Sequence, residues 1–139
     1  MIVSPDGLPL RVLVTPANVP DHKAVKPLLD SLPPVPGPRG RPKTKPDKLL
    51  ADRAYGVESV YVLLITLGIL AVIPRRNSQT HGSGLGRIRY VVERTFAWLG
   101  HWRRLRVCYE KCQEHFQAYH DLAASVICFR RLQAGGTRF

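Results

Sequence analysis

Acidic residues are scarce in this sequence. Only 10 Asp and Glu stand against 21 Lys and Arg, which leaves a formal net charge of +11 and a pI near 10.2. Such an excess does not help the chain to fold, because like charges repel one another and destabilise the compact state. A strongly basic balance is typical of proteins with a polyanionic partner, and nucleic acid is a more common partner of this kind than an anionic membrane. We therefore expect a nucleic-acid partner, with a generally basic protein as the alternative.

Long hydrophobic runs and cysteines are also few. The longest apolar run, residues 60–73, spans fourteen residues and is interrupted by Thr66 and Gly68. A helix needs about 20 apolar residues to cross a bilayer, so we expect no membrane span. The three cysteines cannot all pair within one chain, and the first residues do not resemble a secretory signal. These features predict a cytoplasmic protein with reduced thiols.

The remaining composition is sufficient for one folded domain. Hydrophobic residues make up 45% of the 139 residues, enough for a single core. We assign residues 1–132 to one domain and expect residues 133–139 to be a disordered tail. Within the domain, residues 33–48 are dense in Pro, Gly, Lys and Arg, a composition that predicts an exposed basic loop.

Apolar periodicity and turn residues predict a mixed α/β order of elements. Residues 2–14 are expected to form a hairpin, because apolar and β-branched residues flank the turn-forming triplet Pro5-Asp6-Gly7. A buried strand, a helix and a second strand should follow one another as a βαβ unit, which implies a parallel strand pair. The expected elements after the hairpin are a helix over residues 22–32 capped by Asp21, the strand over 48–51, the helix over 57–67 closed by Gly68, the strand over 69–73, a polar, basic loop over 75–86, and helices over 87–105 and 114–132.

Asp52 directly follows the expected strand over residues 48–51. Ligands of open α/β sheets bind at the carboxyl ends of the strands, so this place favours a functional role for the carboxylate. The neighbouring Arg53 would suit a phosphate-rich substrate. The alternative is that Asp52 only caps the following helix in an ordinary βα loop.

Glu93 lies among the apolar positions of the helix expected over residues 87–105, with Arg89 four residues before it on the same stripe. One interpretation is an exposed Arg89–Glu93 ion pair. The other is a carboxylate that faces Asp52, with Arg89 holding it and reaching a phosphate. Two converging carboxylates in a basic protein would form an oxygen-rich site for Mg²⁺ and substrate phosphate. Metal-assisted phosphoryl transfer uses such a site.

Several segments of the sequence resemble one family. Residues 50–56 (LADRAYG) resemble the segment around the second acidic residue of the DDE transposases of bacterial insertion sequences, and residues 91–99 (VVERTFAWL) resemble the segment around the third. Residues 72–76 (VIPRR) are similar to the family's strand and basic exit, and residues 7–10 (GLPL) and 17–21 (ANVPD) are similar to its hairpin and following loop. The resemblance covers nearly all of residues 1–132.

The resemblance implies an α/β, ribonuclease H-like fold, with a mixed sheet and flanking helices. It also implies an enzyme that cuts and joins double-stranded DNA at transposon ends. Asp52 and Glu93 would be its catalytic residues and the ligands of Mg²⁺ or Mn²⁺. Together with the basic charge, the resemblance makes a set of arginines candidates for DNA contact: Arg53, Arg75, Arg76, Arg89, Arg94, Arg103 and Arg104.

The sequence departs from the family in two places. The family's first aspartate lies on a strand before the hairpin, and neither Asp6 nor Asp21 matches that position. Many relatives also flank the Arg-x3-Glu pair with Tyr and Lys, where this sequence has Gly86 and Gly100. We therefore expect an N-terminally truncated or split transposase that is inactive alone, with the missing N-terminal segment or a second copy in a homo-oligomer as candidate partners. A non-catalytic basic DNA-binding module and a pseudogene product are the alternatives.

Two weaker patterns have simpler structural explanations. Cys108, Cys112 and His115 are spaced as metal ligands are, but no matching second half of a zinc site follows, so core packing of the thiols is favoured. Trp98 and Trp102 lie four residues apart on an expected helix, which favours core packing over stacking on DNA bases.

Overall fold

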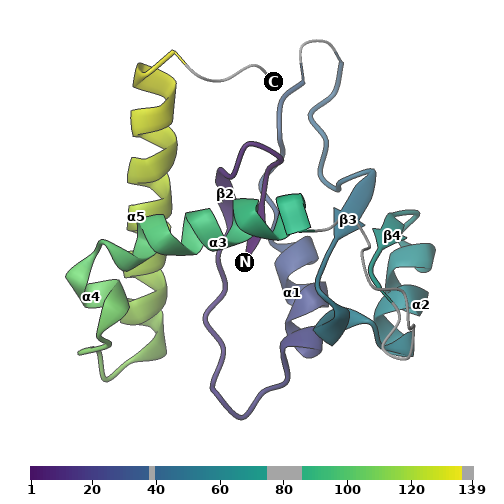
Figure 1. The fold of residues 1–139 in the computed structure, drawn as a ribbon, viewed down its shortest axis with the longest axis horizontal. Helices are drawn as coiled ribbons and strands as arrows, with labels where there is room; N and C mark the ends of the chain where they lie inside the picture. The colour runs from purple at the N-terminus through teal and green to yellow at the C-terminus, as the bar shows by residue number, and fades with distance from the viewer. Residues whose placement is uncertain (38–39, 75–85, 136–139) are drawn as a thin grey trace. The chain divides into compact units, whose positions relative to one another are not determined.

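The computed structural model describes residues 1–37, 40–74 and 86–135, and in the last range its side chains from Tyr90 onward (Figure 1). The chain divides into two compact units, Met1–Val14 with Tyr90–Phe139, and Thr15–Arg89. The described residues contain both helices and two-stranded sheets, so the expected mixed α/β class is confirmed. Of the expected tail, Gln133 still belongs to a helix, and residues 136–139 lie outside the described part of the chain.

The first unit begins with the expected hairpin. Strands β1 (Ile2–Val3) and β2 (Pro9–Arg11) pair antiparallel. Ser4 closes the turn between them, because its backbone N–H donates to the Leu8 carbonyl and its carbonyl accepts from the Gly7 N–H, each over 2.9 Å. The Ser4 hydroxyl oxygen also accepts from the Leu8 N–H over 3.0 Å. The hairpin and its turn are therefore confirmed.

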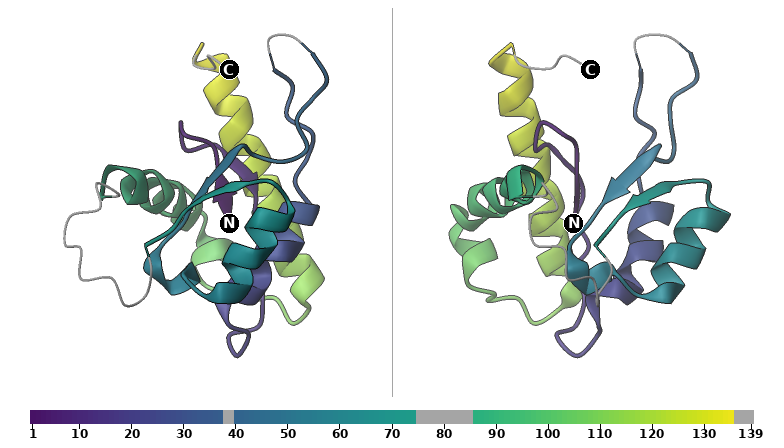
Figure 2. Two further views of the ribbon diagram at one scale, coloured as in Figure 1. Left: turned by 90° about the vertical axis from the view of Figure 1, so that its right-hand side faces the viewer. Right: turned by 45° about the vertical axis from the view of Figure 1, so that its right-hand side comes forward.

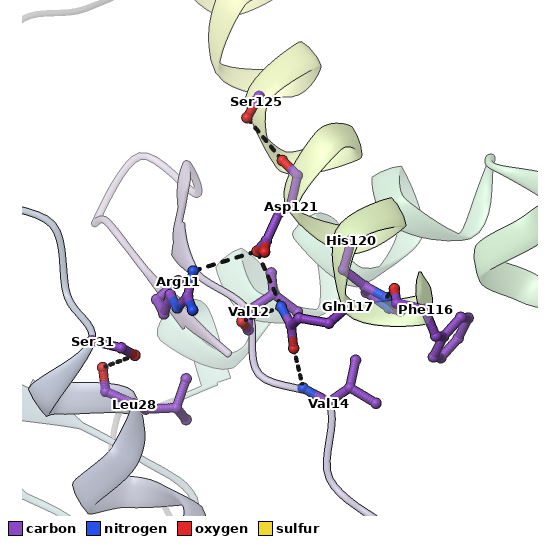
Figure 3. A network of polar contacts seen from close by, with 10 residues as sticks. All are labelled: Arg11, Val12, Val14, Leu28, Ser31, Phe116, Gln117, His120, Asp121 and Ser125. Carbon is purple, nitrogen blue, oxygen red and sulfur yellow. Dashed lines mark hydrogen bonds and ion pairs between the residues drawn. The ribbon is translucent and has the colours of Figure 1, made fainter. Parts of the chain in front are cut away.

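The C-terminal helix α5 (Gln113–Gln133) holds the chain that follows the hairpin (Figure 3). The Gln117 amide donates to the Val12 carbonyl over 2.9 Å and accepts from the Val14 N–H over 2.8 Å. Gln113 donates to the Val14 carbonyl over 2.9 Å. Side-chain amides thus satisfy backbone groups that a neighbouring strand would otherwise pair.

The core of this unit is formed by Val12, Leu99 and Ala123, with Trp102 and Ile127 packed against it. Val12 directly follows β2, while Ala123 and Ile127 belong to α5. The core therefore joins the hairpin to segments more than 80 residues later in the sequence. The expected core role of Trp102 is confirmed. Burial of each large apolar side chain contributes about 1.5–3 kcal/mol to folding.

The helix expected over residues 87–105 is wrong in its length. The structure has α3 (Gly86–Gly100), a turn, and a short α4 (Arg103–Arg106). Glycine has a low helix propensity and ends α3. Trp102 then takes an extended conformation, with φ −85° and ψ 111°, which turns the chain so that its ring packs on the core.

The second unit contains the expected βαβ arrangement. Strands β3 (Lys48–Leu50) and β4 (Leu70–Val72) pair in parallel, and α2 (Glu58–Thr66) connects them. Buried Val60 and Leu64 lie on one face of α2. Gly68 follows the helix with φ +68°, a left-handed conformation that favours glycine and reverses the chain into β4.

The expectation that the first of these strands is buried is wrong. Lys48 is exposed and Leu50 keeps 39% of its surface exposed. Among the described residues, β3 pairs with β4 alone, so its apolar side chains lack the further cover that a larger sheet would give them.

The helix expected over residues 22–32 is present as a 3₁₀ turn, η1 (Asp21–Ala24), followed by α1 (Val25–Asp30). The expected Asp21 cap is wrong, since the N-cap residue is Pro20 and no side chain caps this turn. Pro27 lacks the N–H that an α-helix begun at Asp21 would need at this point. The first turn therefore closes through hydrogen bonds between residues three apart, such as the one that the Val25 N–H donates to the His22 carbonyl.

The basic loop over residues 33–48 has internal bonds of its own. Val35 and Lys43 form a backbone bridge with bonds of 2.8 and 2.9 Å. The Lys43 ammonium donates to the exposed Asp47 carboxylate over 2.5 Å, and this hydrogen bond, together with the charge of Lys43, lowers the pKa of Asp47. Lys45 donates to the Leu67 carbonyl at the end of α2 over 2.6 Å. Figure 2 shows the described residues of this loop extending away from α1 and returning to β3.

Candidate active site and nucleic-acid surface

Asp52 lies at the carboxyl end of β3 and is exposed, as expected. It is also the N-cap of a 3₁₀ turn, η2 (Arg53–Tyr55), where its carboxylate accepts from the Arg53 N–H over 2.5 Å. The capping interpretation of Asp52 is therefore confirmed, and its functional role stays a prediction. Burial raises the pKa of the nearby Tyr55 hydroxyl, and the charges of Asp21 and Asp52 raise it further.

Glu93 lies near the middle of α3 on an exposed face of the helix. Its exposed neighbours on this face are Tyr90 and Phe96, which keep 60% and 55% of their surface exposed. The side chain of Arg89 lies outside the described residues, so the Arg89–Glu93 pair stays a prediction. A carboxylate flanked by exposed aromatic side chains is consistent with a site that contacts a ligand rather than the core.

The residues that follow Glu93 attach α3 to the hairpin turn. Thr95 is completely buried, and its hydroxyl donates to the Gly7 carbonyl over 2.6 Å. Arg94 donates to the Asp6 carbonyl over 2.7 Å, and its guanidinium lies 5.0 Å from the centre of the Trp98 ring. Arg94 was expected to contact DNA, but its guanidinium is engaged within the chain. Sequence reasoning missed this attachment, although a Thr at a buried helix position is a signal of a specific hydrogen bond.

Gly7 is a position in the hairpin turn where an added side chain would disturb the attachment to α3. Its φ of +85° favours glycine, and a Cβ placed there would lie 2.6 Å from the Arg94 Nη2. We expect Gly7→Ala to lower the free energy of unfolding by about 2 kcal/mol, through backbone strain and loss of the Arg94 bond. Urea denaturation measures this change. The matched control is Gly100→Ala, where an added Cβ meets nothing within 4 Å. This control should be neutral or stabilising by up to about 1 kcal/mol, and equal destabilisation by both substitutions would contradict the assignment.

The arginines of α4 differ in their surroundings. Arg104 donates to the Glu110 carboxylate over 2.9 Å and to the Tyr119 hydroxyl over 2.5 Å, and it also stacks over the Tyr119 ring. All three arginines of α4 are exposed, and the Arg104 side chain keeps 56% of its surface exposed. Arg104 differs from the other two in that it links the segment after α4 to α5.

The remaining candidates for DNA contact are described only in part. Arg53 is exposed beside Asp52. Arg75 and Arg76 lie outside the described residues, as does the side chain of Arg89. Their expected contacts with DNA stay predictions.

The zinc alternative finds no support among the described residues, which contain no group of three or more His, Cys, Asp or Glu that could hold a metal ion. Cys108 and Cys112 are exposed, so the expected core packing of these two thiols is wrong. Cys128 is partly buried near the hairpin, and burial raises the pKa of its thiol. Among the residues that the structure describes, no helix is long and apolar enough to span a bilayer.

Comparison with known proteins identifies the family. Residues 1–126 match the family model of the transposase DDE domain. A Burkholderia cepacia protein named "Putative transposase for insertion sequence element IS402" is 41% identical over 133 residues, which cover 96% of this chain and 63% of that protein. The chain therefore spans less than two thirds of the length of this relative. No solved structure matches the chain. The chain belongs to the family of insertion-sequence transposases that share the transposase DDE domain, which confirms the resemblance in its sequence.

Proposed function

We propose that this chain forms the C-terminal part of a ribonuclease H-like catalytic domain that cuts and joins DNA at transposon ends. The family assignment supports this reaction class. The observation that carries the proposal is the place of Asp52, an exposed carboxylate at the carboxyl end of a strand in a parallel pair. Glu93, exposed on α3, is the second carboxylate.

Asp52 and Glu93 would hold the Mg²⁺ or Mn²⁺ ions that the family implies. The donor set fits, because Mg²⁺ sites are commonly built from one or two carboxylates together with substrate phosphates. Ions bound there would activate the attacking oxygen and stabilise the leaving oxygen of the phosphodiester. The protein's own part is to orient the two carboxylates. Asp52 is held by its bond to the Arg53 N–H, and Glu93 is held through the attachment of α3 to the hairpin turn.

The third carboxylate would come from a strand outside these 139 residues. Among the described residues, β3 pairs with β4 alone and Leu50 remains partly exposed. A further strand at the open edge of β3 would cover such apolar surface. It would also place a carboxylate beside Asp52, because strand ends at one edge of a sheet lie close together.

Exposed arginines would bind the phosphates of the DNA. Arg53 beside Asp52 and Arg103 on α4 are exposed members of the expected set whose guanidinium groups would contact phosphates, and exposed Arg106 joins them. We propose that Arg94 and Arg104 act by positioning the hairpin turn and the segment after α4. Arg75, Arg76 and Arg89 remain proposed phosphate contacts.

A non-catalytic DNA-binding module is the second candidate function. The net charge of +11 favours it whether or not the carboxylates converge. The distinction between the two candidates is therefore whether one bound ion contacts both Asp52 and Glu93.

The proposal is tested in a protein that joins residues 1–139 to the part of the Burkholderia cepacia relative that this chain does not span; we call it the joined protein. Fe²⁺ in place of Mg²⁺ generates hydroxyl radicals from peroxide, and these cut the nearest backbone. We expect cuts near both Asp52 and Glu93, since each would be an ion ligand. Asp52→Asn should remove both cuts, whereas Glu58→Gln, a change at an exposed carboxylate in the first turn of α2, should remove neither. Cutting near only one of the two carboxylates would exclude the shared site.

A further inference from the structure

The helix α5 carries an exposed apolar stripe. Leu122, Phe129 and Leu132 keep 58%, 59% and 55% of their surface exposed. Two small exposed residues share this face: Ala118 lies one turn before Leu122, and Ser125 lies between Leu122 and Phe129. We call these five residues the α5 stripe. Three large apolar side chains along one exposed helix face are more than the scattered exposed residues of an ordinary surface.

The spacing of the α5 stripe is that of helix-to-helix packing. Its members follow one another at intervals of four, three, four and three residues. This alternation is the heptad spacing that brings a continuous seam of side chains against a second helix. Other residues of α5 attach it to its own fold: Gln117 bonds to Val12 and Val14, and Asp121 lies 3.5 Å from Arg11. The stripe therefore lies on a face that these attachments do not use.

The composition of the α5 stripe fits a second copy of itself in antiparallel orientation. When the two helices cross between positions 123 and 124, Phe129 faces the partner's Ala118 and Leu122 faces the partner's Ser125. Phe129 and Leu122 then each meet a small side chain, which is the condition for close packing of two layers, while Leu132 faces the partner's His115. A parallel pair would instead place Phe129 against the same residue of the partner and Ser125 against Ser125 of the partner subunit.

The charges along α5 favour the same orientation. Glu114 lies in the first turn, and Arg130 and Arg131 lie in the last. In an antiparallel pair the acidic start of one helix lies beside the basic end of the other, and the helix dipoles also oppose one another favourably. A parallel pair would bring the four arginines of the two copies together.

We propose that the α5 stripe is a self-association surface on which a second copy of this chain docks with its α5 antiparallel. The inference does not rest on DNA binding or on catalysis. Three large side chains bury less surface than a standard interface, so the dimer is weak, with a Kd on the order of 10 μM. The positive charge of both copies opposes association, and physiological salt screens this repulsion.

Sedimentation velocity of the 139-residue chain over a range of concentrations tests the proposal. We expect a monomer–dimer equilibrium that Phe129→Glu shifts to monomer, with a Kd raised about tenfold or more. The matched control is Ile65→Glu on α2, which also places a charge on an exposed apolar residue, with 75% of its surface exposed. It should leave the dimer unchanged. A chain that is monomeric at all concentrations, or a dimer that only Ile65→Glu dissociates, overturns the proposal.

Cysteine cross-linking tests the orientation. In a background with the three native cysteines replaced, one copy carries His115→Cys and the other Leu132→Cys. In the antiparallel register these positions face each other, while like positions lie 17 residues apart, about 25 Å at 1.5 Å per residue. A disulfide needs Cα atoms within about 7 Å. We expect the mixed dimer to cross-link and each variant alone not to; cross-linking of each variant with itself overturns the antiparallel arrangement.

Discussion

The 139-residue chain alone is expected to leave duplex DNA uncut in the presence of Mg²⁺ or Mn²⁺, whereas the joined protein is expected to nick it. Two-metal chemistry needs enough anionic ligands to hold both ions beside the scissile phosphate. Asp52 and Glu93 supply two carboxylates, and we propose that the third comes from the added segment. The difference in nicking rate should be at least about a hundredfold, since an ion site without a bridging ligand binds weakly.

The added segment should also change how the chain behaves in solution. A strand edge without a partner is prone to pair with other chains and to cause aggregation. The joined protein should therefore be the more soluble of the two at equal concentration. Metal-dependent nicking by the 139-residue chain that disappears in Asp52→Ala would contradict the need for a third carboxylate.

The affinity of the chain for duplex DNA is expected to fall steeply with salt and to depend little on sequence. Each phosphate contact releases counterions, so a protein with six to ten contacts loses about 10³ to 10⁵ in affinity between about 50 and 200 mM salt. Exposed cations such as Arg103 and Arg106 supply such contacts. Fluorescence anisotropy with two unrelated duplexes measures the slope.

Single substitutions separate surface contacts from structural arginines. Arg103→Gln should reduce the salt slope by about one unit, because it removes one phosphate contact. Arg104→Gln is the matched control, since this guanidinium is bonded to Glu110 and Tyr119. It should change the slope little while lowering the free energy of unfolding. An affinity that stays constant across this range of salt would exclude phosphate contacts as the source of binding.

Local elements of this fold could be predicted from the sequence because their signals are local. A turn-forming triplet before Leu8 and a glycine after α2 mark chain reversals that need no distant partner. The end of α3 at Gly100 could not be placed, because Arg103–Arg106 is helical again and the apolar pattern runs through both elements. The extended Trp102 between them depends on packing against Val12 and Ala123, which are distant in sequence.

The candidate site was predictable to a similar degree. Short motifs predict Asp52 and Glu93 as site residues, and both are exposed in the structure. The bonds that Arg94 and Arg104 form within the chain were not predictable, since an arginine in a basic sequence looks the same whether it binds a phosphate or another part of the protein. Only the hairpin turn 88 residues away and the Tyr119 hydroxyl distinguish them. The proposed convergence of the two carboxylates would depend on contacts between segments far apart in sequence, which local patterns do not record.

We propose above that Asp52 and Glu93 are the metal-binding carboxylates of a DNA-cutting site. It is tested most directly by the nicking rate of the joined protein with Asp52→Asn or Glu93→Gln, alongside duplex affinity. The claim predicts that each substitution lowers the rate at least about a hundredfold and leaves duplex affinity unchanged or slightly higher, because each removes a ligand and one negative charge. Glu58→Gln, which removes the same charge from α2, should keep the rate. An Asp52→Asn protein that nicks DNA as fast as the Glu58→Gln protein would contradict the claim.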